Sequence, residues 1–223
     1  MRVVCFGDSL TEGAYGGSYF DALRRLRPDL DLINAGVGGD TVLNLLERLD
    51  EDVLAHQPDA VFVMVGGNDA VSYSQPLTRS YYKNAKEVPD GVVPPEAFAR
   101  AYRDLLERLH LEHIVVSVGL PPAEANATLV DALRTYNQLA SEAARAVAAP
   151  VLDLFAAFVP THIPDRPPLD IGTILTIGQH VKSGWRDYES ARAKGDYTFT
   201  FDGLHLMPET AERMAEQIAS FLP

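Results

Sequence analysis

Short apolar runs alternate with helical patterns along most of the chain, and this alternation leaves few folds open. Five nearly continuous apolar runs bounded by Gly, Pro or Asn predict strands at residues 2–6, 30–34, 60–65, 114–118 and 151–154. Apolar residues at three-or-four spacing predict helices at residues 19–26, 41–54, 96–109, about 128–148 and 209–222, with Asp40 as a candidate N-cap. Strands without a polar face are covered on both sides. The order therefore predicts an α/β protein with a parallel sheet.

Two segments do not follow this alternation. Residues 70–95 and 155–201 mix prolines, glycines and aromatic residues and show no long periodic helix, so we expect them to be irregular lids, binding loops or disordered segments. The chain has 223 residues, which is more than the roughly 150 of a typical domain and less than two such domains. We therefore predict a single domain, residues 1–223, with insertions at about 70–95 and 155–201.

Charge and composition exclude several classes of partner. Thirty-one acidic residues against nineteen Lys plus Arg give a net charge of −12, the wrong sign for nucleic acid or an anionic membrane surface. No apolar run reaches the about 18 residues of a membrane span, and the first residues do not form a signal-peptide core. We expect a soluble, cytoplasmic protein without nucleic-acid binding or membrane insertion. The single Cys5 excludes an internal disulfide, and its apolar neighbours predict a buried thiol.

Parallel sheets bind ligands beyond the carboxyl ends of their strands, so the loops there carry the functional signal. Gly7-Asp8-Ser9-Leu10 follows the first strand and puts a hydroxyl in a strand-to-helix turn, although this block taken alone favours a cap of the next helix by Asp8 or Ser9. The second strand leads into Asn34-Ala35-Gly36-Val37-Gly38-Gly39-Asp40-Thr41, which places free N–H groups at a helix start. A phosphate loop would end in Gly-Lys-Ser/Thr, and here Asp40 and Thr41 follow Gly39. The pattern favours an oxyanion cradle.

Two further loops supply an amide and an imidazole. Gly66-Gly67-Asn68-Asp69 follows the third strand, and the Asn68 amide offers two donors. Asp202-Gly203-Leu204-His205 precedes the last helix and sets a carboxylate three residues before an imidazole. Each loop alone also fits an ordinary turn. Together they put a nucleophile, hydrogen-bond donors, a base and an acid on one edge of the predicted sheet.

With these four blocks the sequence resembles the SGNH, or GDSL, hydrolase family, over a stretch from residue 6 to residue 205. The resemblance implies a three-layer α/β/α sandwich with a five-stranded parallel sheet, of flavodoxin-like type, and ester hydrolysis without a metal or cofactor. It implies Ser9 as nucleophile, His205 as general base and Asp202 as the group that orients the imidazole. It also implies an oxyanion hole made of the backbone N–H groups of Ser9 and Gly39 and the side-chain amide of Asn68.

The expected function is hydrolysis of a small-molecule carboxylic ester through an acyl-enzyme at Ser9, with short acyl or acetyl groups favoured. Carbohydrate deacetylation, lysophospholipid or thioester cleavage, and acyl transfer stay open as alternatives, with a non-catalytic binding module less favoured. Tyr73, Tyr81, Tyr82 and Trp185 are candidate substrate contacts, although aromatic residues in a long loop also form a small core of their own. The sequence does not indicate an oligomeric state.

Competing motifs are weaker. Ser80-Tyr81-Tyr82-Lys83 matches the Ser-x-x-Lys of penicillin-recognising enzymes, but Ser-Asp-Asn and Lys-Thr-Gly are absent. The other histidines lack paired-ligand spacing, so we expect no metal site. Asn126 begins a glycosylation sequon, but a helix cap is the better interpretation. Asp8 and Asp69 are interpreted as structural hydrogen-bonding residues.

Overall fold

The five predicted strands form one parallel sheet in the computed structural model, which describes residues 1–223. The strands are β1 (Arg2–Gly7), β2 (Asp31–Gly36), β3 (Ala60–Met64), β4 (Val115–Gly119) and β5 (Val151–Leu152). Their order across the sheet is β2-β1-β3-β4-β5, and every neighbouring pair is parallel. The chain moves from β1 to β2 on one side and then returns to β3 on the other. The loop after β1 therefore lies where the strand order reverses, the usual position of a ligand site in such sheets.

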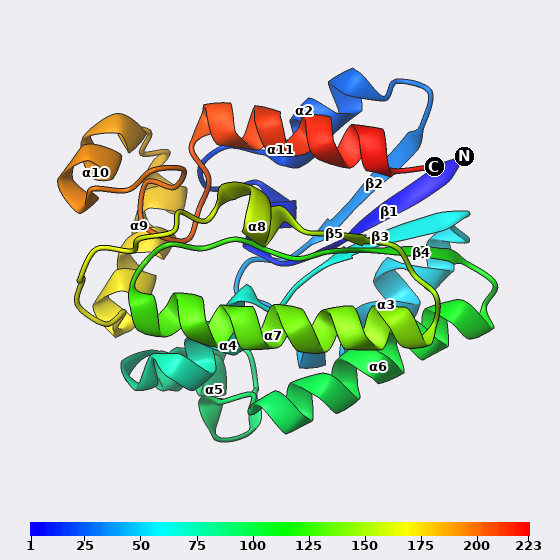
Figure 1. Cartoon of the computed structure of the whole chain (residues 1–223), viewed down its shortest axis with the longest axis horizontal. Coiled ribbons are helices and arrows are strands. Elements are labelled where there is room, and N and C mark those ends of the chain that lie inside the picture. The colour runs from blue at the N-terminus through cyan, green and yellow to red at the C-terminus, as the bar shows by residue number, and fades with distance from the viewer.

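Helices cover both faces of the sheet, as expected for a three-layer sandwich (Figure 1). One layer contains α3 (Val42–Asp52), α6 (Pro95–Leu111) and α7 (Ala127–Ala146), and the other contains α2 (Tyr19–Leu26) and α11 (Pro208–Phe221). Val4 and Phe6 of β1 pack into the core under the first layer, whereas Val3 and Cys5 pack into the core under the second. This alternation follows from the strand period of two. Cys5 is fully buried, as predicted.

The remaining helices gather toward the carboxyl ends of the strands, where α9 (Ile171–Ser183) and α10 (Tyr188–Gly195) lie at the opposite end of the molecule from both termini (Figure 1). The others are α1 (Ser9–Glu12), α4 (Gly67–Ser74), α5 (Arg79–Ala85) and α8 (Leu154–Phe158), with short 3-10 turns at Leu54–His56, Pro76–Thr78 and Pro89–Gly91. None of the helices has both the length and the apolar character needed to cross a bilayer.

Three local expectations are wrong. The segments 70–95 and 155–201 are not irregular, because they contain α4, α5, α8, α9 and α10, whose short or mixed patterns hide their periodicity. The last strand ends at Leu152, because Asp153 caps α8 through a bond from the Ala156 N–H. Thr41, not Asp40, is the N-cap of α3 and forms a capping box with Asn44. Asn126 does cap α7, because its side chain accepts the Leu129 N–H at 2.9 Å.

Candidate active site

Ser9 is the first residue of α1, directly after the end of β1. The Asp8 side chain caps this one-turn helix by accepting the Leu10 N–H at 3.0 Å, so the turn is locally fixed. Gly7 is needed before it, because a Cβ there would lie 2.3 Å from Thr11 Oγ1 and 2.4 Å from the Met64 carbonyl oxygen. The Ser9 N–H donates no hydrogen bond within the chain. The loop thus presents a hydroxyl and a free N–H together at the strand-order reversal.

His205 and Asp202 come to Ser9 from the other end of the sequence. The Nε2 atom of His205 lies 3.0 Å from Ser9 Oγ, and its Nδ1 atom lies 2.8 Å from Asp202 Oδ2. The other Asp202 oxygen, Oδ1, accepts the N–H groups of Leu204 at 2.9 Å and His205 at 2.7 Å, which closes the turn between acid and imidazole. With the Nδ1 proton directed at the carboxylate, Nε2 can accept the Ser9 hydroxyl proton.

Asp202 and His205 stabilise each other's charged forms, and this shifts both of their pKa values. Burial opposes the charged imidazolium, but Asp202, with smaller effects of Asp8 and Glu12, outweighs it and raises the pKa of His205 above its usual value. Burial likewise opposes the charged carboxylate of Asp202, yet His205 and the two N–H donors lower its pKa below the usual value. The ring of Tyr15 meets the His205 ring edge-on at 5.1 Å and shields it. This environment suits a histidine that gains a proton during a reaction.

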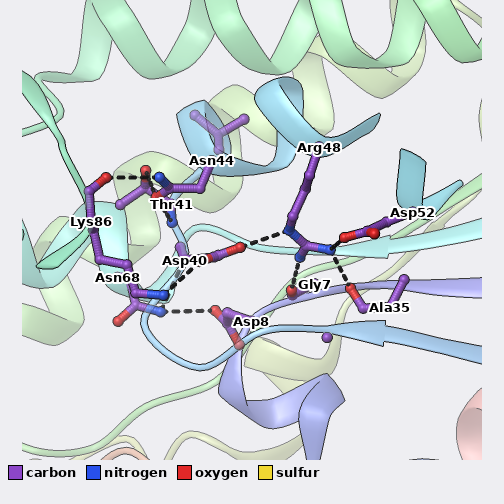
Figure 2. Close-up of polar contacts among 12 residues, drawn as sticks. Gly7, Asp8, Ala35, Asp40, Thr41, Asn44, Arg48, Asp52, Asn68 and Lys86 are labelled. Atoms are coloured by element: carbon purple, nitrogen blue, oxygen red, sulfur yellow. Dashed lines mark hydrogen bonds and ion pairs between the residues drawn. The ribbon is translucent and has the colours of Figure 1, made fainter. Parts of the chain in front are cut away.

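Gly39 and Asn68 line the same cavity as Ser9 and His205. Gly39 has a φ of +81°, which favours glycine, and its N–H donates no hydrogen bond within the chain. The Asn68 amide differs from expectation, because its Nδ2 faces protein acceptors: the Asp40 carbonyl oxygen at 3.1 Å and Asp8 Oδ2 at 3.4 Å (Figure 2). The bond to Asp8 is long, so that N–H is the more available of the two.

Asp8 and Asp69 hydrogen-bond the backbone, as expected. Burial, the largest effect, raises the pKa of Asp8 to about 6, although the Leu10 N–H, His205 and Asn68 oppose it. Burial also raises the pKa of Asp69 to about 8, and this carboxyl accepts the Val42 N–H at the start of α3. Both groups hold loops around Ser9 in place. Neither carboxyl has a hydrogen bond to the Ser9 hydroxyl or the His205 ring.

The cavity at Ser9 has a volume of about 230 Å³ and mainly apolar walls. One wall belongs to the loop after β4 and to α4, and another to α9, in a segment predicted to be irregular. Carboxylates enter the lining at Asp8 and Glu12, and the Glu12 side chain makes no ion pair. The apolar lining residues are Leu10, Ala14, Tyr15, Val71, Tyr81, Pro121, Pro122, Ala123, Ile174, Ile177, Val181 and Leu204.

Of the four aromatic residues predicted to contact substrate, only Tyr81 lines this cavity. Tyr82 is buried, and its hydroxyl donates to Asn68 Oδ1 at 2.9 Å. Tyr73 is 45% exposed and packs beside Tyr136. Trp185 stacks on His180 and lines a neighbouring cleft on the other side of α9. Sequence position could not distinguish Tyr81 from Tyr82, because successive residues of a helix such as α5 point in different directions.

One buried residue near the site was missed by the sequence reasoning. Glu124, after β4, is fully buried and accepts the N–H groups of Thr198, Phe199 and Thr200, just before Asp202. The sequence signal that could have identified Glu124 is its position in the loop after the fourth strand, next to the end of the sheet that carries the other candidate residues.

Comparisons with known proteins agree with this architecture. The chain is 38% identical to the uncharacterised lipoprotein YqeF of Bacillus subtilis and 34% identical to the acetylxylan esterase of Geobacillus stearothermophilus, over 30% of this chain in each case. These alignments span 32% and 39% of the two relatives' own lengths, well under half. In structure, the chain is similar to the acetyl xylan esterase AlAXEase, with a TM-score of 0.69 and 19% identity, over 100% of both chains.

The family model described as "GDSL-like Lipase/Acylhydrolase family" matches residues 5–175. That range includes Ser9, Gly39 and Asn68 and ends before Asp202 and His205, which hydrogen bonds connect to each other and to Ser9. Because the match covers more than half of the sequence, the chain belongs to the GDSL-like lipase/acylhydrolase family, a family of ester-bond hydrolases.

Proposed function

We propose that this protein hydrolyses short-chain carboxylic esters through a covalent acyl-enzyme at Ser9. The continuous contact from Ser9 Oγ through the His205 ring to Asp202 carries the proposal, with separations of 3.0 Å and 2.8 Å. A nucleophile within hydrogen-bond reach of a base, with a third group that orients the base, is the arrangement typical of acyl transfer through a covalent intermediate.

The reaction has two halves. His205 Nε2 takes the Ser9 proton as Oγ bonds to the ester carbonyl carbon, and His205 then protonates the leaving alcohol. In the second half, His205 activates water, which attacks the acyl-enzyme and releases the acid and Ser9. Asp202 holds the imidazole and stabilises its cation throughout.

The negative charge on the carbonyl oxygen needs donors. The backbone N–H groups of Ser9 and Gly39 are free of internal partners, which supports their assignment to an oxyanion hole. Asn68 supplies a third donor when its long contact with Asp8 gives way to the oxyanion. Catalytic donors are often poorly aligned before substrate binds and tighten in the transition state.

The cavity supports a small acyl group. Its volume of about 230 Å³ lies below the roughly 300–1,000 Å³ of pockets for drug-sized ligands. A second candidate substrate is an acetylated carbohydrate, which the 34% identity to an acetylxylan esterase favours.

Trapping tests the acyl-enzyme. An organophosphonate should label Ser9, as shown by peptide mass mapping, and Ser9→Ala should abolish both labelling and esterase activity. An adduct at another serine, or undiminished activity in Ser9→Ala, would contradict the proposal.

A series of p-nitrophenyl esters of increasing acyl length, run beside acetylated xylose and with Ser9→Ala as the blank, defines the substrate. We expect the highest kcat/KM at two to four carbons, because the cavity is smaller than pockets for drug-sized ligands. Product analysis with an added alcohol distinguishes hydrolysis from acyl transfer.

A further inference from the structure

Asp40 connects the two oxyanion residues that do not belong to the Ser9 loop. It follows Gly39 directly in the sequence, and its carbonyl oxygen accepts the Asn68 Nδ2–H at 3.1 Å. A shift of Asp40 would therefore move both the Gly39 N–H and the Asn68 amide. Its own side chain is only 5% exposed, so its carboxylate needs partners inside the protein.

Two cations provide those partners, one on each carboxylate oxygen. Arg48 Nε lies 2.8 Å from Asp40 Oδ2, and Lys86 Nζ lies 2.7 Å from Asp40 Oδ1. The side chains of Arg48 and Lys86 are only 16% and 14% exposed. Such a pair of contacts, largely removed from solvent, fixes the carboxylate more firmly than surface ion pairs would.

Arg48 attaches Asp40 to the sheet. From α3 it donates to the carbonyl oxygens of Gly7 and Ala35, both at 2.9 Å, near the ends of β1 and β2 (Figure 2). Its guanidinium also lies 4.6 Å from the centre of the Phe6 ring. Because Arg48 holds so many groups, its removal would disturb the sheet edge as well as Asp40.

Lys86 attaches Asp40 to the insertion at 70–95. Its carbonyl oxygen accepts Asn44 Nδ2 at 2.8 Å, so its backbone is fixed to the start of α3. Its side chain also covers Gly39: a Cβ on Gly39 would lie 2.8 Å from Lys86 Cε and 2.1 Å from the Tyr81 hydroxyl. Lys86 thus closes the Gly39 turn by packing and holds its neighbour Asp40 by charge.

We propose that Lys86 is a positioning residue of the oxyanion hole, acting through Asp40 on Gly39 and Asn68. The inference rests on the proposed function and adds a contribution from the insertion, outside the four sequence blocks. Oxyanion donors act on the transition state more than on bound substrate, so their displacement lowers kcat and leaves KM nearly unchanged.

The test compares Lys86→Met with Lys86→Arg and with Lys83→Met, which changes an exposed lysine of α5. Active sites are titrated with an organophosphonate, so kcat refers to folded, competent enzyme. We expect Lys86→Met to lower kcat on p-nitrophenyl acetate about tenfold, less than the about 10²–10³ lost with a whole donor. KM should stay within about twofold, since the contacts that bind the ester equally well before and during the reaction are unchanged. Lys86→Arg should recover part of kcat, and Lys83→Met should match the wild type.

A boronic acid gives a readout that a merely structural lysine would not move. Its tetrahedral serine adduct places an oxygen in the hole, so Lys86→Met should weaken its inhibition by the same factor as kcat. An unchanged kcat per titrated site, even with a lower melting temperature, would overturn the inference. If Lys86→Met does not fold, Lys86→Gln replaces it under the same criterion. Wild-type enzyme without ester turnover would instead contradict the proposed function, and this inference with it.

Discussion

Replacing Glu124 with glutamine tests how firmly one buried carboxylate holds the segment that carries Asp202 and His205. Oε1 of Glu124 accepts the N–H groups of Thr198 at 3.0 Å and of Phe199 and Thr200 at 2.8 Å, together with the Thr200 hydroxyl. Oε2 accepts the Thr198 N–H and hydroxyl. The side chain is fully buried, so water does not substitute for these bonds.

The magnitude follows from the loss of charge with retention of shape. A hydrogen bond to a charged group contributes about 1.5–3 kcal/mol and a neutral one about 0.5–1.5 kcal/mol, so each bond loses about 1 kcal/mol. Of the five donors, the two hydroxyls can rotate to suit an amide, so the three backbone N–H groups set the magnitude. We therefore expect Glu124→Gln to lower the free energy of unfolding by about 3 kcal/mol, which a domain of ordinary stability, about 5–15 kcal/mol, tolerates.

Urea unfolding followed by circular dichroism measures this change, provided that the m-value stays constant. Glu189→Gln is the matched control, because the Glu189 side chain is 66% exposed and pairs with Arg192 at the surface. The control should change stability by less than about 0.5 kcal/mol. A loss in Glu124→Gln below about 1 kcal/mol would refute the argument that the charge of this carboxylate stabilises the segment.

Three further predictions concern activity. Because the pKa of His205 is raised and this residue must be neutral to act as the proposed general base, kcat/KM should fall as pH drops through a midpoint above about 6.5. Asp202→Asn should move that midpoint to lower pH in a pH–rate profile, and a wild-type midpoint below about 6 would contradict this. Gly39→Ala should reduce kcat on p-nitrophenyl acetate at least about 100-fold, because the new Cβ would lie 2.1 Å from the Tyr81 hydroxyl and the φ of +81° disfavours alanine. Tyr81→Phe in the same background should restore part of kcat, and full activity of Gly39→Ala would contradict the assignment of Gly39 as a donor. Ile174→Ala should enlarge the cavity and raise the hexanoate-to-acetate ratio of kcat/KM about tenfold, and an unchanged ratio would show that α9 does not limit acyl length.

The sheet could be predicted from the sequence because burial on both faces leaves a local pattern. Val3 to Phe6 are apolar without interruption, and each of them packs into one of the two cores. The position of Ser9 followed from the strand before it. The resemblance to the family implies His205 and Asp202, and their three-residue spacing is compatible with one short turn that joins the carboxylate to the imidazole, as the structure has it.

Contacts between distant segments could not be predicted in the same way. The local sequence presents Asp40 as a helix cap, whereas its side-chain partners are Arg48 and Lys86, the latter 46 residues further on. Asn68 was expected to offer two free donors, and only the fold shows acceptors from two other loops beside it. Aromatic residues raise the same difficulty, because Tyr81 lines the cavity whereas the next residue, Tyr82, is buried away from it.

The turns at the strand ends and the helix α9 contribute differently to the site. The proposed reacting groups Asp202 and His205 lie in a turn fixed by internal hydrogen bonds. Asp202 Oδ1 closes that turn, and Glu124, after β4, holds the segment just before it. By contrast, α9 contains no buried residue although it supplies much of the apolar cavity wall. A helix with so little burial is among the first elements to move or open. Substitutions in α9 should therefore change KM and acyl preference while leaving the pH–rate midpoint in place, since that midpoint depends on His205 and the carboxylates around it.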